Sequence, residues 1–236
     1  MLLCGRSCSG YYLVEFLADS KERTKMSEKT KNEVLTDAEI DAEAEMIREK
    51  KHSVKIIAVV GMSGSGKSVA IDYLTEQGYP KVYFGGMILK GLEKAGLEVN
   101  EENEKNFREQ IRKTEGKDWV VRQVIDEVHD LIKAGQKRIV LDGVYSWTEY
   151  KTLKHEFPGI LTFVAIVVPK KLRYKRVGQR EFRPLTIEEV KSRDNNEIEN
   201  LEKGGPIAAA DYYVLNDGSI EQMEKKVKEI LTEIDF

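Results

Sequence analysis

Short apolar runs alternate with longer stretches of helical periodicity along the chain from residue 54 onward. Apolar runs of roughly four to eight residues, separated by helices, are typical of β-α units around a parallel sheet. The pattern therefore predicts an α/β fold in which five buried strands form one sheet. The expected strands are Val54–Val60, Lys81–Phe84, Lys137–Leu141, Leu161–Val168 and Tyr212–Leu215.

Three of the expected helices begin with a capping box. In this motif a Ser or Thr side chain accepts a hydrogen bond from the backbone three residues on, and a Glu or Gln there bonds back. One box follows each of the last three strands, so the predicted helix and strand boundaries agree with one another. The boxes are Ser146 with Glu149, Thr186 with Glu189, and Ser219 with Gln222.

Residues 1–52 differ in composition from the rest and are interpreted as an N-terminal extension to one domain at residues 53–236. A further capping box, Thr36 with Glu39, predicts one helix over residues 38–50. Residues 1–17 lack the basic start and sustained apolar core of a secretory signal. Met26 is a second candidate for the start of translation.

Composition indicates a globular protein with a highly charged surface, since 33% of residues are charged and 41% are hydrophobic. The longest purely apolar run, Phe163–Val168, is too short to cross a bilayer, so no membrane span is expected. A net charge of −3 argues against non-specific electrostatic binding of nucleic acid. Cys4 and Cys8 are the only cysteines, which fits a reducing cytoplasm. A monomer or a weak homo-oligomer is expected.

The first strand leads into G-x-x-x-x-G-K-S, the phosphate-binding loop known as Walker A. Its glycines let backbone N–H groups point inward, and the following helix directs its positive end to the same place. Lys67 is expected to reach the β- and γ-phosphates of ATP, and the Ser68 hydroxyl to ligate Mg²⁺. The predicted cofactor-binding residues here are Gly61, Met62, Ser63, Gly64, Ser65, Gly66, Lys67, Ser68 and Val69.

Polar residues also follow the third and fifth strands. Asp142 is expected to hold Mg²⁺ or to orient the nucleophile, with a turn-capping role as the alternative. Gly143 would allow close approach of backbone or of an acceptor substrate. Asn216 is expected either to contact an adenine edge through its amide or to shape the turn.

Between residues 85 and 135, the chain is too long for a simple crossover, which predicts an inserted helical subdomain that binds the phosphoryl acceptor. The small-residue turn at Gly85 and Gly86 opens this segment. Arg112 is suited to clamp an acceptor phosphate with two parallel hydrogen bonds, although a solvated helix face is an equal alternative.

Arginines are dense after the fourth strand, which predicts a mobile lid over residues 177–186. A lid of this kind neutralises the charge of the transferring phosphoryl group and excludes water. Arg176 and Arg180 are the candidate catalytic members. The full group is Arg173, Arg176, Arg180, Arg183 and Arg193.

This order of motifs resembles the nucleoside monophosphate kinase group of P-loop kinases over about residues 54–235. The chain looks most like dephospho-CoA kinases and a related archaeal family of predicted nucleotide kinases. The stretches that carry this likeness begin at Arg112, Arg193 and Ala210. The resemblance implies a three-layer P-loop fold with strand order 2-3-1-4-5, ATP with Mg²⁺, and a nucleotide-like acceptor.

The sequence departs from these families in the acceptor region. Tyr145 and Ser146 stand where the archaeal relatives place an arginine, and Gly86 stands where relatives tend to carry Asp. Lys90 or Arg112 is a candidate to supply the missing charge.

The sequence therefore predicts an ATP-dependent kinase of a nucleotide-like small molecule. Two alternatives remain. One is a regulatory NTPase that acts as a switch on a protein partner, and the other is an enzyme that phosphorylates a nucleic-acid end.

Overall fold

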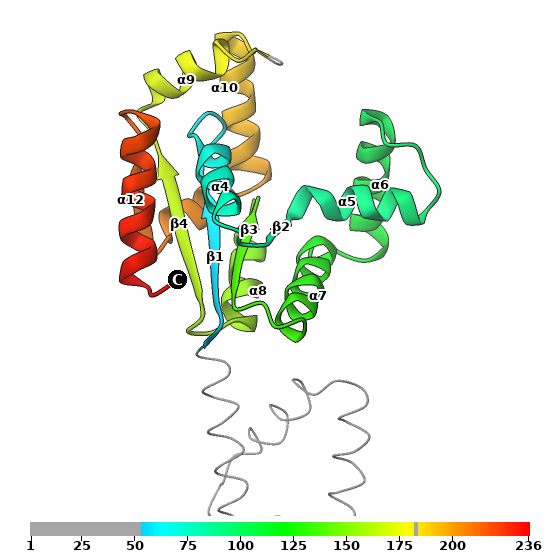
Figure 1. Ribbon diagram of the computed structural model, residues 1–236. Helices are drawn as coiled ribbons and strands as arrows, with labels where there is room; N and C mark the ends of the chain where they lie inside the picture. Colours follow the sequence, from blue (N-terminus) through cyan, green and yellow to red (C-terminus); the bar gives the residue numbers. More distant parts are fainter. Residues whose placement is uncertain (1–52, 182–183) are drawn as a thin grey trace, which may run out of the picture. The chain divides into compact units, whose positions relative to one another are not determined.

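The computed structural model describes residues 53–181 and 184–236 (Figure 1). Its sheet has five strands, all parallel, in the order β2-β3-β1-β4-β5. This confirms the predicted fold class, the number of strands and their order. The strands are β1 (Lys55–Val60), β2 (Lys81–Tyr83), β3 (Arg138–Asp142), β4 (Leu161–Val167) and β5 (Tyr212–Leu215).

Helices connect the strands and cover the sheet. The single segment between β2 and β3 holds three of them, α5 to α7, whereas α4 alone links β1 to β2. One turn of π-helix, η1, continues α10 directly. The helices are α4 (Lys67–Glu76), α5 (Phe84–Lys94), α6 (Glu101–Thr114), α7 (Trp119–Lys133), α8 (Trp147–Glu156), α9 (Lys170–Gly178), α10 (Ile187–Asn195), η1 (Asn196–Asn200), α11 (Gly204–Ala208) and α12 (Ile220–Glu233).

The core lies on both faces of the sheet because side chains alternate along each strand. On one face, Val164 of β4 joins Leu74 of α4 and Val227 of α12 in a buried apolar cluster, and Figure 1 shows these two helices beside the strands. On the opposite face, Phe163 packs against Tyr150 of α8, with ring centres 4.5 Å apart. The sheet is therefore the middle of three layers.

All three predicted capping boxes are present, with both reciprocal hydrogen bonds. In α12, the Ser219 hydroxyl accepts from the backbone of Gln222, and the Gln222 side chain accepts from the backbone of Ser219. These bonds satisfy donors that a helix start otherwise leaves without partners.

Replacing Ser219 by alanine is expected to lower the free energy of unfolding by about 1 kcal/mol, because one of the two capping bonds is lost. Ser192→Ala is the matched control, since Ser192 is exposed inside α10 and caps no helix. Urea denaturation of both variants measures the difference. Equal stabilities of the two variants would contradict the importance of this cap.

The start of the acceptor insertion differs from the sequence-based expectation. Gly85 and Gly86 were expected in a turn, but the helix α5 begins at Phe84 and includes both. A short strand and a buried Phe84 side chain let the helix start directly after β2. A side-chain carbon added at Gly85 would lie 2.4 Å from the Tyr83 hydroxyl, so the close approach of Tyr83 explains that glycine.

Several sequence-based predictions concern residues outside the described part of the chain. These are the N-terminal extension with its helix at 38–50, the start at Met26, the two cysteines, and Arg183 of the lid. Within residues 53–181 and 184–236, no helix has the length and apolar character needed to cross a membrane.

Candidate active site

A cavity of about 480 Å³ opens at the carboxyl end of the sheet, the edge at which parallel α/β folds bind ligands. The whole phosphate-binding loop contributes to its wall, together with residues from α9, from the α10–α11 region and from the segment after β5. Its lining residues are Gly61–Val69, Tyr145, Arg176, Arg180, Arg193, Glu197, Lys203, Asn216, Gly218, Ile220 and Met223.

The loop has a backbone conformation suited to binding phosphate. Gly64 and Gly66 have φ angles of 83° and 91°, in the left-handed region that favours glycine. The hydroxyls of Ser63 and Ser65 are buried and have no hydrogen-bond partner among the described residues. Because buried polar groups are nearly always paired, these two hydroxyls and the start of α4 fit a bound polyphosphate.

Lys67 and Asp142 face each other at the mouth of the loop. β1 and β3 are neighbours, with Val59 opposite Asp142, so the carboxylate lies next to the loop as the sequence predicted. The Lys67 ammonium donates to Asp142 Oδ1, and both side chains are largely buried. A bound triphosphate offers Lys67 a more highly charged partner, which would leave Asp142 available to a metal ion.

Arg173 is a structural residue rather than part of a mobile lid, which corrects the expectation for this arginine. It is buried and binds both oxygens of Asp194, at 2.7 and 2.5 Å. The same guanidinium donates to the carbonyl of Ser63 at 2.9 Å. Arg173 therefore ties α9 and α10 to the phosphate-binding loop.

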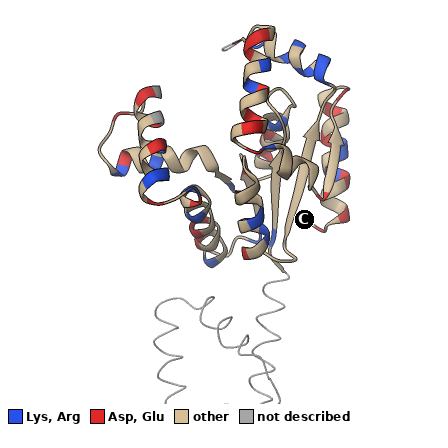
Figure 2. Ribbon diagram, turned by 180° about the vertical axis from the view of Figure 1, so that it is seen from behind, with Lys and Arg blue, Asp and Glu red and all other residues tan. Residues whose placement is uncertain are grey.

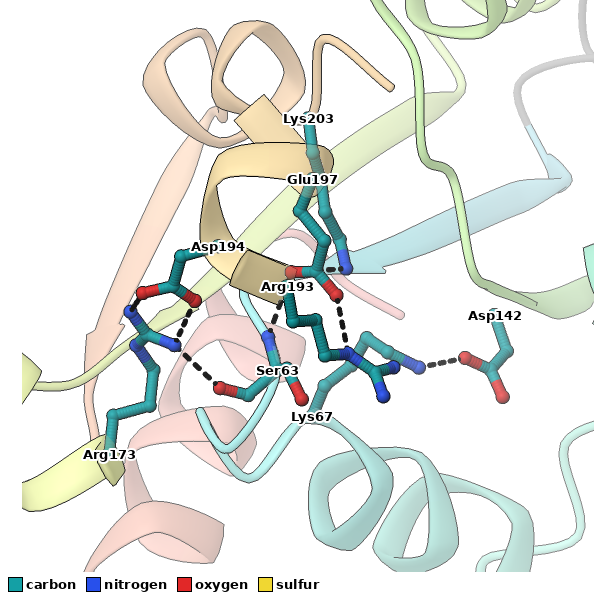
Figure 3. A network of polar contacts seen from close by, with 8 residues as sticks. All are labelled: Ser63, Lys67, Asp142, Arg173, Arg193, Asp194, Glu197 and Lys203. Carbon is teal, nitrogen blue, oxygen red and sulfur yellow. Dashed lines mark hydrogen bonds and ion pairs between the residues drawn. The ribbon is translucent and has the colours of Figure 1, made fainter. Parts of the chain in front are cut away.

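Glu197 of the π-helical turn binds the same loop residue, Ser63, through its backbone N–H (Figure 3). Its Oε2 accepts from the Ser63 backbone N–H at 3.1 Å and from the Lys203 ammonium at 3.3 Å. Its Oε1 accepts from Arg193 Nε at 3.3 Å. The carboxylate therefore links three donors at the rim of the cavity. Single π-helical turns occur often at functional sites.

Arg176, Arg180 and Asn216 all reach the cavity wall, as the sequence led us to expect. Arg176 donates to the Asn216 carbonyl at 2.8 Å, and Asn216 Nδ2 donates to the Ser65 carbonyl at 2.9 Å. Asn216 thus shapes the phosphate-binding loop through its side-chain amide N–H. Arg180 lies beyond the end of α9 and is exposed, so it is not on the same helix face as Arg176. Figure 2 shows the high density of basic residues along α9.

The other expected acceptor residues do not line this cavity. Gly85 and Gly86 lie in α5, and Arg112 is exposed on α6. Gly143 follows β3 with a φ of 97°, and a side-chain carbon there would lie 3.0 Å from the Tyr145 hydroxyl. Lys90, the alternative source of charge, is paired with Glu127 at 2.5 Å.

The sequence reasoning missed six residues of the cavity as site residues: the polar Tyr145, Glu197 and Lys203, together with Gly218, Ile220 and Met223. Arg193 and Glu197 are four residues apart, a spacing that joins side chains on one helical face and was a usable signal. No sequence signal marks Lys203, whose side chain is buried beside Glu197 and Tyr145. Burial lowers the pKa of its ammonium, Glu197 opposes that shift, and the positive charges of Lys67 and Arg193 reinforce it.

Tyr145 and Glu149 form a buried polar corner next to β3. Burial raises the pKa of the Tyr145 hydroxyl, as do Tyr83 and Asp142. Burial also raises the pKa of the Glu149 carboxyl, against hydrogen bonds from the backbone of Tyr145 and Ser146 at 2.7 and 3.0 Å. The positive charge of Arg112 on α6 also opposes this rise in the Glu149 pKa.

The exchange Glu149→Gln is expected to flatten the pH dependence of stability while keeping the helix cap, because Gln also completes a capping box. The raised pKa means that the protonated form favours the fold. This contribution is complete below the ordinary value of 4.5 and is lost as the pH rises through the folded-state pKa. Urea denaturation at several pH values from about 4 to 8 measures the free energy of unfolding of the wild type and of Glu149→Gln. A stability difference that is constant over this range would contradict the prediction.

The donor set around the loop fits a magnesium ion bound together with a nucleotide. Mg²⁺ prefers oxygen ligands and keeps several waters, so it needs only one or two protein groups beside phosphates. Ser68 and Asp142 supply a hydroxyl and a carboxylate at the same end of the loop. Among the described residues, no group of three or more His, Cys, Asp or Glu side chains forms a metal-binding cluster.

Comparison with known proteins identifies the family. The chain is 35% identical over 182 residues to the UPF0200 protein TK1334 of Thermococcus kodakarensis, which covers 76% of this chain and 97% of that protein. A UPF0200 protein of Sulfurisphaera tokodaii is 34% identical and covers 77% of this chain and 98% of its own. The chain belongs to the UPF0200 family. A family model described as an AAA domain also matches, at residues 57–202, so this UPF0200 member belongs to that family as well.

Among solved structures, TT1252 from Thermus thermophilus has a TM-score of 0.50 and 22% sequence identity, covering 76% of this chain and 97% of its own. At this identity the likeness shows a shared fold only. The UPF0200 chain thus has a P-loop kinase-like fold, as predicted, and the narrower resemblance to dephospho-CoA kinases stays a prediction.

Proposed function

We propose that this protein transfers the γ-phosphate of Mg-ATP to a nucleotide-like small molecule, such as a nucleoside monophosphate or dephospho-CoA. The observation that carries the proposal is the convergence of a complete phosphate-binding loop and four cationic side chains beyond it on one cavity of about 480 Å³. These cations are Arg176, Arg180, Arg193 and Lys203. Phosphoryl transfer is accelerated mainly by positioning and by stabilising negative charge, so such a wall suits the reaction.

Each residue has a proposed part in this reaction. Loop amides and Lys67 hold the β- and γ-phosphates, and Ser68 and Asp142 hold Mg²⁺. When bound, the ion neutralises charge on the phosphate oxygens. Arg176 and Arg180 stabilise the charge of the transferring group.

Asn216 is proposed to contact the ATP nucleotide. The proposed binding site for the phosphoryl acceptor comprises Gly85, Gly86, Arg112 and Gly143. An acceptor phosphate bound there would meet the positive end of α5 and the guanidinium of Arg112. The protein is proposed to act in the cytoplasm as a monomer or weak homo-oligomer.

The competing proposal is a regulatory NTPase that changes a partner contact on nucleotide binding or hydrolysis. The half-buried Tyr145 at the position of the missing arginine favours it, because the acceptor side then lacks a cation there. The cationic wall favours the kinase.

ADP release from Mg-ATP distinguishes the two proposals. For a kinase, release should rise at least about tenfold when a pool containing the right small acceptor is added, because a bound acceptor completes the closed site. A rate of ADP release that is unchanged by every small-molecule pool but rises when a protein partner is added would instead support the regulatory NTPase.

A further inference from the structure

Lys203 is a buried cation for which the phosphate-binding motif does not account. Its side chain is 5% exposed, and its Nζ lies 3.3 Å from Glu197 Oε2 and 5.0 Å from the centre of the Tyr145 ring. A lysine this deeply buried loses most of its hydration, which costs free energy unless an anion lies beside it. Glu197 meets this need only in part, because it also accepts from Arg193 and Ser63.

The described residues at the mouth of the loop carry more positive than negative charge. Lys203 and Arg193 share the carboxylate of Glu197, and Lys67 is paired with Asp142. Three cations therefore lie near two carboxylates. Lys203 and Lys67 are largely buried, so little water screens their repulsion, whereas Arg193 is half exposed. An anion with several charges would stabilise this arrangement.

The position of Lys203 indicates which part of a nucleotide it would meet. It reaches the loop from the N-terminus of α11, and Glu197 Oε2 joins its ammonium to the Ser63 N–H (Figure 3). Its other neighbour, Tyr145, belongs to the segment that follows Asp142. Lys203 therefore lies between the loop and the strand end where the terminal phosphate of ATP is expected.

Resting on the proposed function, we propose that Lys203 is a second phosphate-binding lysine that contacts the γ-phosphate of ATP, and that Glu197 positions it before the nucleotide binds. When its ammonium turns to the phosphate, Glu197 keeps Arg193 and the Ser63 N–H as partners. The loop thus stays attached to η1 while the lysine moves. Lys203 then distinguishes ATP from ADP, because only ATP places a phosphate within its reach.

The test is the affinity of Lys203→Met for two magnesium-bound nucleotides, measured by calorimetry. A charge-assisted hydrogen bond to the γ-phosphate predicts that affinity for a non-hydrolysable ATP analogue falls by about tenfold or more. Affinity for ADP should stay within about twofold, since ADP lacks that phosphate. Lys151→Met, an exposed exchange on α8, is the matched control and should change neither affinity. The variant Lys203→Arg keeps the charge and should recover part of the preference for the ATP analogue.

Lys203→Met leaves the Glu197 carboxylate with one cation fewer, which could destabilise the fold. The double variant Glu197→Gln/Lys203→Met removes this unbalanced charge and is titrated in the same way. Thermal unfolding shows whether each variant is folded. If Lys203→Met lost affinity for ADP and for the ATP analogue equally, the lysine would have only a structural role, and the proposal would be overturned. Unchanged affinity for both nucleotides would also overturn it. A wild type that binds both nucleotides with the predicted pattern but phosphorylates no acceptor would contradict the kinase and leave the role of Lys203 supported. A wild type that binds neither nucleotide would overturn both.

Discussion

Replacing Lys67 by methionine is expected to reduce phosphoryl transfer at least about a thousandfold, because the β- and γ-phosphates lose the one loop cation that reaches both. Methionine keeps an unbranched side chain that is only one atom shorter, and it removes the charge. The rate of product formation with saturating Mg-ATP measures the effect. Lys171→Met, an exposed exchange on α9, is the matched control and should keep the wild-type rate.

Removing Lys67 also leaves Asp142 without its ammonium partner, so the variant must be checked for folding. The double variant Lys67→Met/Asp142→Asn removes both charges and should recover stability, yet it should stay inactive because the phosphates still lack their cation. A folded Lys67→Met protein that transfers phosphate at the wild-type rate would contradict the role of this loop.

Replacing Arg173 by methionine is expected to lower the free energy of unfolding by about 3 kcal/mol, because the buried Asp194 carboxylate then lacks its ion-pair partner. The same exchange frees the Ser63 carbonyl, so nucleotide binding should weaken as the loop loses its attachment to α9. Urea denaturation measures the first effect and calorimetric titration with Mg-ADP measures the second.

The double variant Arg173→Met/Asp194→Asn separates the two effects of Arg173. It removes the buried charge and should restore part of the stability, but it cannot restore the hydrogen bond to Ser63, so nucleotide binding should stay weak. A double variant that recovers full affinity would show that the Ser63 contact has no importance for the loop.

The Arg173–Asp194 pair also has a defined pH range. Burial opposes ionisation of the Asp194 carboxyl, but Arg173 and Tyr174 outweigh it and hold the pKa below its ordinary value of 3.8. The stability that the ionised form contributes is therefore fully present above this ordinary value. It is lost as the pH falls through the lower folded-state pKa.

Hydrophobic periodicity and capping boxes are local signals, so they were sufficient to predict the five strands and the parallel α/β class. The three layers and the strand order were implied by the resemblance to P-loop kinases. The Walker A motif likewise specifies its own residues. The strand ends differed by a residue or two, as at Phe84, which starts α5 instead of ending β2. Its buried side chain is compatible with the end of a strand and with the start of a helix, so the sequence pattern does not separate the two.

Side-chain partners across the fold could not be predicted in this way. Arg173 and Arg176 look alike in a basic stretch, yet Arg173 is buried against Asp194 and Arg176 faces the cavity. The difference depends on where α10 packs, which is a tertiary contact. Lys203 is the clearest case, since an isolated lysine in a polar turn is normally exposed and becomes buried here only through Glu197 and Tyr145.

The most direct measurement is the mass of the products formed when the wild-type protein is incubated with Mg-ATP and separate pools of nucleoside monophosphates, dephospho-CoA and nucleosides. The account predicts one product heavier by a phosphoryl group, in one of the acceptor pools, and no such product with Lys67→Ala. ATP binding without a phosphorylated product in any pool would contradict the kinase and favour the regulatory NTPase.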